Sequence, residues 1–75
     1  MDIENLIRMA NRIGDFFEAY PDRDEARRSI ADHLHKFWEP RMRRDLYAHF
    51  DHDGAPGLKP IVAEAIQKHR AELAV

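Results

Sequence analysis

The side chains that could hold a metal ion in this 75-residue chain are few, and the densest group lies near residue 50. His49 is three residues before His52 and four before Asp53, so one turn of helix could direct these side chains toward one point. A structural zinc site needs four ligands, and a catalytic site needs three with one open position. The chain has no cysteine, and this single group falls short of either set. We therefore expect no metal site.

The same region begins like a calcium-binding loop. The segment Asp51-His52-Asp53-Gly54 has the spacing of the first ligands of such a loop. Its fifth position would be Ala55 and its twelfth Val62, and neither offers a side-chain oxygen. We interpret residues 51–57 as a turn-forming stretch that follows a helix.

Candidates for catalysis are nearly absent. Ser29 is the one serine, and the chain has no threonine and no cysteine, so a covalent nucleophile has almost no candidate. Gly54 and Gly57 belong to a turn and form no phosphate-binding loop. We expect no catalytic and no cofactor-binding residues, and hence no enzyme activity of this chain on its own.

Aromatic and arginine side chains form the most informative pattern. Adjacent residues on a helix point about 100° apart, so Phe37 and Trp38 cannot both centre on one buried stripe, and the same holds for Phe16 and Phe17. One ring of each pair exceeds what a small core can hide. A single such ring could fold over the edge of the bundle, but two rings beside arginines and a methionine favour a protein contact surface.

We predict that this surface binds a protein partner. Trp38 and Met42 would supply buried apolar area, the arginines hydrogen bonds, and Pro40 the corner between two helices. Arginines that are scattered around a helix and interrupted by Glu39 and Asp45 argue against a nucleic-acid site, which needs a contiguous positive stripe. The predicted partner-binding residues are Phe16, Tyr20, Phe37, Trp38, Pro40, Arg41, Met42 and Arg43.

Four helices must position these residues. Apolar residues recur at helical spacing over residues 2–20, 23–38, 40–51 and 59–73, and no strand-like alternation occurs. Asp22 has the spacing of an N-cap, and Pro40 suits the first position of a helix. The apolar arc of the first helix covers about half its circumference, which predicts contact on two sides. The apolar stripe of the second helix comprises Ala26, Ile30, His33, Leu34 and Phe37.

Composition predicts a single small all-α domain, a bundle of three principal helices plus a fourth C-terminal helix. The chain is 44% hydrophobic, 35% charged and has a formal net charge of −2. No apolar run approaches the roughly 20 residues that span a membrane, and the acidic start lacks signal-peptide character. We expect a cytoplasmic protein. A domain this small without disulfides is a candidate for stabilisation by a partner or by self-association.

Three segments resemble the delta subunit of NAD-dependent, molybdenum- or tungsten-containing formate dehydrogenases. They are residues 9–17 (MANRIGDFF), residues 31–43 (ADHLHKFWEPRMR) and residues 58–62 (LKPIV). The Phe-Trp-acid-Pro-Arg-Met-Arg string is the most specific of them, and together they span nearly the whole chain.

The resemblance implies a non-catalytic accessory subunit that binds and stabilises a cytoplasmic complex. In such complexes the alpha subunit holds a bis-molybdopterin guanine dinucleotide centre with molybdenum or tungsten and iron–sulfur clusters. The beta and gamma subunits hold FMN, the NAD site and further clusters. The alpha, beta and gamma subunits are the implied partners. A chain without cysteine lacks the thiolates that iron–sulfur clusters normally use.

Two alternatives remain at this point. The chain could be a maturation factor that assists insertion of the metal cofactor and then leaves the enzyme. It could also be a free-standing helical homodimer or nucleic-acid-binding module, which the net charge of −2 disfavours.

Overall fold

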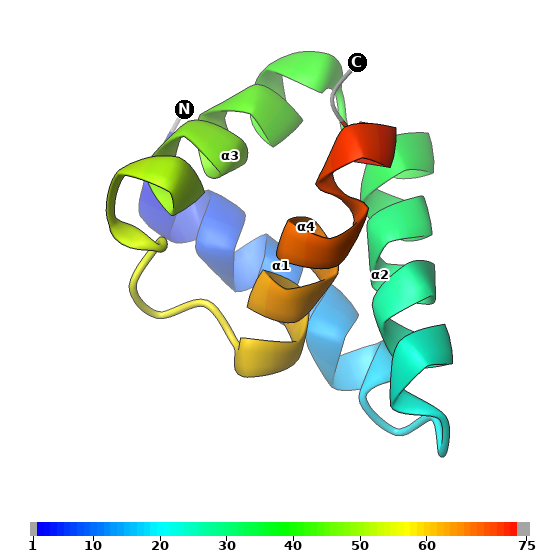
Figure 1. The fold of residues 1–75 in the computed structure, drawn as a ribbon. Coiled ribbons are helices and arrows are strands. Elements are labelled where there is room, and N and C mark those ends of the chain that lie inside the picture. Colours follow the sequence, from blue (N-terminus) through cyan, green and yellow to red (C-terminus); the bar gives the residue numbers. More distant parts are fainter. Residues whose placement is uncertain (1, 74–75) are drawn as a thin grey trace.

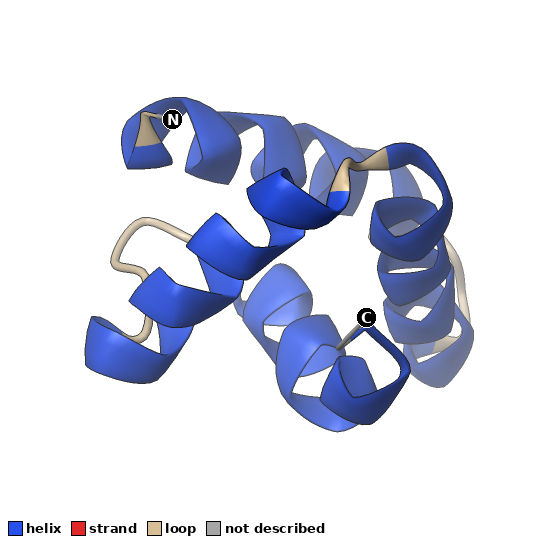
Figure 2. Cartoon of the chain, turned by 90° about the horizontal axis from the view of Figure 1, so that it is seen from above, coloured by secondary structure: helices blue, strands red, loops and turns tan. Residues whose placement is uncertain are grey.

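The computed structural model describes residues 2–73, and the side chains of residues 2–70. This part of the chain consists of helices and loops without a strand (Figure 2). The predicted small all-α bundle is confirmed. The helices are α1 (Ile3–Phe17), α2 (Arg23–Phe37), α3 (Pro40–Asp53) and α4 (Pro60–Leu73). The side chain of Leu73, which the sequence pattern assigns to the last helix, lies outside the described residues.

Two helix ends differ from the sequence expectation by two or more residues, and the other bounds agree within one residue. Helix α1 ends at Phe17, and a turn in which the Tyr20 N–H donates to the Phe17 carbonyl (3.0 Å) leads to Pro21. The restriction that Pro21 places on Tyr20 prevents the helix from continuing past this turn. Helix α3 continues to Asp53 and ends at Gly54, whose φ of 77° is the left-handed conformation that glycine adopts without strain.

Aspartate side chains cap the first two helices, and the sequence predicts the cap of the second. The Asp22 carboxylate accepts hydrogen bonds from the N–H groups of Asp24 (2.9 Å) and Glu25 (3.4 Å), which confirms Asp22 as the N-cap of α2. Asp2 caps α1 through the N–H of Glu4 (3.0 Å). These bonds satisfy amide donors that the first turn of a helix leaves unpaired.

Helices α1 and α4 each contact all three other helices. Helices α1 and α2 diverge from the turn that joins them, and α4 lies in front of α1 and packs most extensively on α2 (Figure 1). The contacts of α1 with α2, α3 and α4 explain its broad apolar arc, and the predicted contact on more than one side is confirmed. The core draws on all four helices, and its largest fully buried side chains are Leu6, Ile30, Leu34, Leu46, Ile61, Val62 and Ile66.

Two residues of α1 hold the start of α4 against it. A Cβ atom built on Gly14 would lie 2.6 Å from the Cγ2 atom of Val62, so only glycine permits this close approach. The Asn11 side chain donates to the Gly57 carbonyl (2.9 Å) and accepts from the Lys59 N–H (2.9 Å). The loop before α4 is therefore fixed to α1.

Candidate protein–protein interface

Trp38 belongs to the core of the monomer. Its side chain is 7% exposed and joins the buried cluster, so the expectation that it supplies free apolar area to a partner is wrong. The reason is local: Trp38 is the C-cap of α2 and has an extended backbone (φ −86°, ψ 141°). Its ring no longer follows the 100° helical rotation, and the turn toward α3 directs it inward.

Arg43 is also buried, at 5% exposure, and it uses its donors inside the chain. Its Nη1 atom donates to the carbonyls of Leu34 (3.2 Å), His35 (3.0 Å) and Trp38. These carbonyls end α2, where the helix dipole places partial negative charge that stabilises a cation. The expected hydrogen bonds to a partner are thus replaced by bonds to the chain's own backbone.

The rings left outside the core are Phe16 and Phe37. Phe16 is 67% exposed, Phe37 is 71% exposed and Tyr20 is 36% exposed. One ring of each adjacent pair therefore remains outside the core, but in the second pair the outer ring is Phe37 and not Trp38. The sequence pattern predicts Phe37 on the buried stripe of α2, but Phe37 is exposed because α1 has diverged from α2 by that last turn (Figure 1).

Five rings form one continuous cluster, which we call the aromatic surface: Phe16, Phe17, Tyr20, His33 and Phe37. Phe17 contacts Phe16 (ring centroids 4.9 Å apart) and Tyr20 (5.3 Å) edge to face. It also faces His33 (6.2 Å), which packs against Phe37 (4.7 Å). Edge-to-face ring pairs stabilise one another, so the exposed rings are held in place before any partner binds.

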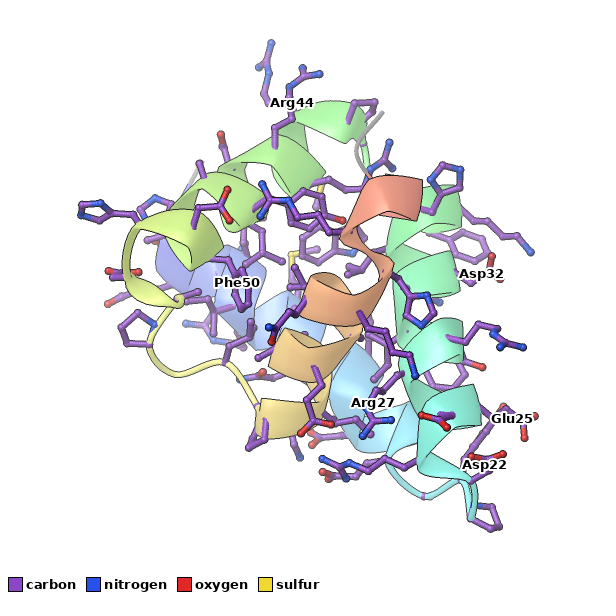
Figure 3. The ribbon with its side chains drawn as sticks, viewed as in Figure 1. Asp22, Glu25, Arg27, Asp32, Arg44 and Phe50 are labelled. Atoms are coloured by element: carbon purple, nitrogen blue, oxygen red, sulfur yellow. The ribbon has the colours of Figure 1, made fainter. Side chains whose placement is uncertain are left out.

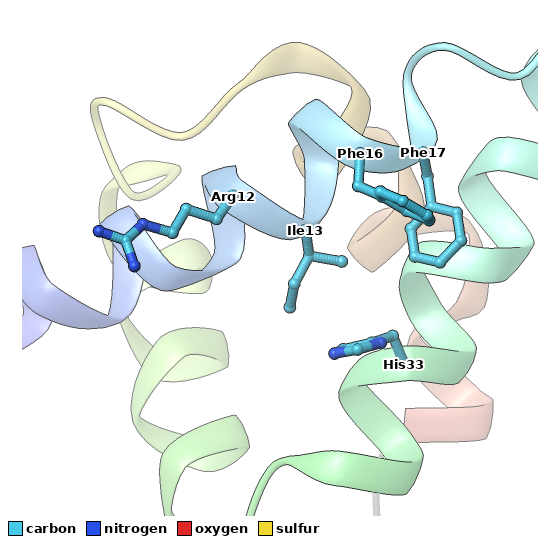
Figure 4. A pocket seen from close by; sticks show the side chains of 5 residues that line it. All are labelled: Arg12, Ile13, Phe16, Phe17 and His33. Carbon is cyan, nitrogen blue, oxygen red and sulfur yellow. The ribbon is translucent and has the colours of Figure 1, made fainter.

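A groove runs beside these rings between α1 and α2, and we call it the α1–α2 groove. It has a volume of about 360 Å³ and is lined by Arg12, Ile13, Phe16, Phe17 and His33. Figure 4 shows Ile13 and His33 directed into it from the two helices, with Arg12 at the end away from the phenylalanines. The walls are apolar except for Arg12 and the imidazole.

The other predicted contact residues lie at the corner between α2 and α3. Pro40 occupies the first position of α3, as the sequence indicates, and is exposed together with Arg41. Met42 is half-buried and packs against the core. Of the eight predicted residues, the structure brings Phe16, Tyr20 and Phe37 into one exposed surface.

Sequence reasoning missed four residues of this region: Arg12, Ile13 and Phe17 from α1 and His33 from α2. His33 and Phe37 are four residues apart on α2, and Ile13 and Phe17 are four apart on α1. That spacing was the available signal, since residues four apart share a helix face.

Acidic side chains near the groove are already paired. Lys59 forms ion pairs with Asp15 and Glu18. The hydrogen bonds of these pairs raise the pKa of Lys59, and the bond to Asp15 has the larger effect. Lys36 pairs with Asp32 (3.0 Å) on the outer side of α2. Arg12 has no ion pair or hydrogen bond with any residue whose side chain the structure describes. It is the one charged residue that lines the α1–α2 groove.

The groups considered as metal ligands have other roles. Asp51 forms an ion pair with Arg70, which lowers the pKa of Asp51, and Asp53 accepts a hydrogen bond from the Ala55 N–H (3.0 Å). Between residues 2 and 70, no three His, Asp or Glu side chains are grouped so as to hold a metal ion.

Comparison with known proteins identifies the family. None of the helices within residues 2–73 has the length and apolar character needed to cross a membrane. No curated protein and no solved structure matches the chain. The family model described as NADH-dependent formate dehydrogenase delta subunit FdsD matches residues 5–66, which is most of the chain. The chain therefore belongs to the family of formate dehydrogenase delta subunits.

Proposed function

We propose that this protein is a non-catalytic accessory subunit that binds the large subunits of an NADH-dependent formate dehydrogenase and stabilises their complex. The observation that carries the proposal is the aromatic surface, in which Phe16 and Phe37 are more than half exposed in a member of a delta-subunit family. A chain of this size gains stability by covering such rings with a larger neighbour.

The proposed contact is built around Phe16, Phe37 and Tyr20. Aromatic side chains bury large areas with few rotamers lost, and a small number of them usually supply most of the binding free energy of an interface. Their ring contacts with Phe17 and His33 hold them in the monomer, so little ordering is required when the partner binds. Arg41, exposed near the same end of α2, would add hydrogen bonds at the edge of the contact.

The residues of this chain do not fit the redox centres of such a complex. It has no cysteine for an iron–sulfur cluster, and the described side chains form no group suited to a metal. We propose that the centres lie in the partner subunits: the molybdenum or tungsten bis-molybdopterin guanine dinucleotide site and iron–sulfur clusters in alpha, and FMN, the NAD site and further clusters in beta and gamma. We place the complex in the cytoplasm, where its nicotinamide cofactor is available.

Co-purification tests the proposal. The tagged chain is expressed with the alpha, beta and gamma subunits, either unchanged or with Phe16→Ser and Phe37→Ser. We expect the double variant to retain its helical circular dichroism and to recover at least roughly tenfold less of the large subunits. The matched control carries His49→Ser and His52→Ser at exposed positions of α3. Equal recovery from the double variant and the control would place the contact elsewhere.

Stoichiometry separates an accessory subunit from a maturation factor. We expect the unchanged chain to remain in the purified, active complex in a fixed ratio to the alpha subunit. A chain that co-purifies with cofactor-free enzyme but is absent from active enzyme would contradict the accessory role.

A further inference from the structure

We propose that the α1–α2 groove binds an amphipathic helix of a partner subunit, with a carboxylate of that helix paired to Arg12. This rests on the proposed function, because the helix belongs to a subunit of the same complex. Beyond the proposed function, it specifies where the partner binds, that the bound segment is a helix, and that this helix carries an acidic residue.

The groove has the form of a site for one more helix. Ile13 and Phe16, three residues apart on α1, form one wall, and His33 lies on the facing wall on α2 (Figure 4). Phe37, four residues beyond His33 on α2, packs against the His33 ring beside the groove. Rows of side chains three and four residues apart are the ridges between which another helix packs. A helix placed there would cover the three rings that the monomer leaves most exposed.

An extended segment is a poorer occupant. It would need backbone hydrogen bonds from the walls, as it receives at the edge of a sheet. The helices that form the groove have already used their backbone groups internally, and the lining offers the Arg12 guanidinium and the His33 imidazole as its polar groups. Unpaired peptide groups buried against Ile13 and Phe16 would be costly. A helix satisfies its own backbone and so avoids this cost.

The charge of Arg12 indicates that the partner helix carries an acidic residue. Arg12 lies at one end of the groove and has no partner among the side chains that the structure describes, while Asp15, Glu18 and Asp32 are held by Lys59 and Lys36. An acidic residue at the matching end of the bound helix would complete a bidentate pair with the guanidinium. A second copy of this chain would present another Arg12 and no acidic residue from its own groove, so charge favours a different partner.

Photocrosslinking in the assembled complex tests the identity of the occupant. The probe is p-benzoylphenylalanine in place of Phe37, which is close in shape, and in place of exposed Ala48 on α3 as the control. We expect the probe at position 37 to label one partner segment with apolar residues at helical spacing and an acidic residue beyond them. The control should not label that segment. Labelling of a strand, of an irregular loop or of a second copy of this chain would overturn the proposal.

Charge reversal tests the role of Arg12. We expect Arg12→Glu to weaken binding of the large subunits by roughly five- to tenfold, and reversal of the acidic residue found by crosslinking to restore it. The control Arg44→Glu changes net charge equally at a side chain that projects away from the bundle (Figure 3) and should have no such effect. Equal effects of the two variants, or no restoration, would refute the pair.

The outcomes separate the two levels of inference. If the unchanged chain fails to co-purify with any large subunit, the proposed function fails. If it co-purifies but crosslinks through Ala48 and not through Phe37, the accessory function stands and the groove proposal fails.

Discussion

The two adjacent aromatic residues at the end of α2 have opposite roles, and replacing each by alanine separates them. Trp38 is almost fully buried, and removing so large a core side chain costs about 3–5 kcal/mol. Phe37 is largely exposed, and its removal should change the free energy of unfolding by less than about 1 kcal/mol. A domain of this length has roughly 4–11 kcal/mol of stability in total. Trp38→Ala should therefore leave it marginally folded, and Phe37→Ala should leave it stable.

Urea unfolding followed by far-ultraviolet circular dichroism measures both effects. Circular dichroism is required because Trp38 is the single tryptophan, so Trp38→Ala has no indole fluorescence to follow. In the unchanged chain and in Phe37→Ala the same fluorescence reports directly on burial of Trp38. Affinity for the large subunits should follow the reverse order. Phe37→Ala should bind them more weakly although its stability is unchanged, and the folded fraction of Trp38→Ala should keep its affinity.

A clear result would refute this reasoning. If Trp38→Ala and Phe37→Ala unfolded at the same urea concentration, Trp38 would not be a core residue. The assignment of the inner and outer ring, and the aromatic surface built on it, would then be wrong.

Two further predictions follow from polar contacts. Arg43→Met removes the guanidinium donor from three backbone carbonyls, of which Leu34 still accepts from the Trp38 N–H. The variant should therefore lower the free energy of unfolding by roughly 2–3 kcal/mol in the same urea assay. Arg43→Lys should recover part of the loss, and no loss in Arg43→Met would refute the capping role. Glu64 of α4 accepts hydrogen bonds from Arg23 (3.0 and 3.1 Å) and Arg27 (2.8 Å) of α2. These bonds lower the pKa of Glu64 to about 2, and the bond from Arg23 is the largest cause. Because the folded pKa lies below the usual 4.5, this contribution to stability is present above pH 4.5 and is lost as the pH falls toward 2. Glu64→Gln should therefore show a smaller fall in melting temperature between pH 6 and pH 3 than the unchanged chain, by a modest amount because the pair is partly solvated and screened by salt.

Helical periodicity and cap chemistry are local, and the sequence alone was enough to predict them. The four helices, the Asp22 cap and the position of Pro40 at the start of α3 all follow from spacing within one turn of chain. The same local geometry shows that Phe16 and Phe17 cannot share one buried stripe. Exposure of an aromatic ring was therefore predictable, as was the inclusion of Phe16 and Phe37 in a candidate surface.

Some residues in the segments that resemble formate dehydrogenase delta subunits have structural roles that the sequence did not reveal. Gly14 permits close contact between α1 and α4, Asn11 fixes the loop before α4, and Arg43 closes the end of α2. These roles depend on partners far along the chain or across a turn. In the sequence, Arg43 could not be distinguished from Arg41, which is exposed.

Only the tertiary structure decided which ring faces outward and what lies beside it. Trp38 turns inward because the chain is extended at that residue, and Phe37 remains outside because α1 diverges from α2. The same divergence opens the groove lined by Ile13 and His33. Burial depends on the angle at which helices cross, and that angle is set by the packing of all four helices together, which no single stretch of sequence encodes.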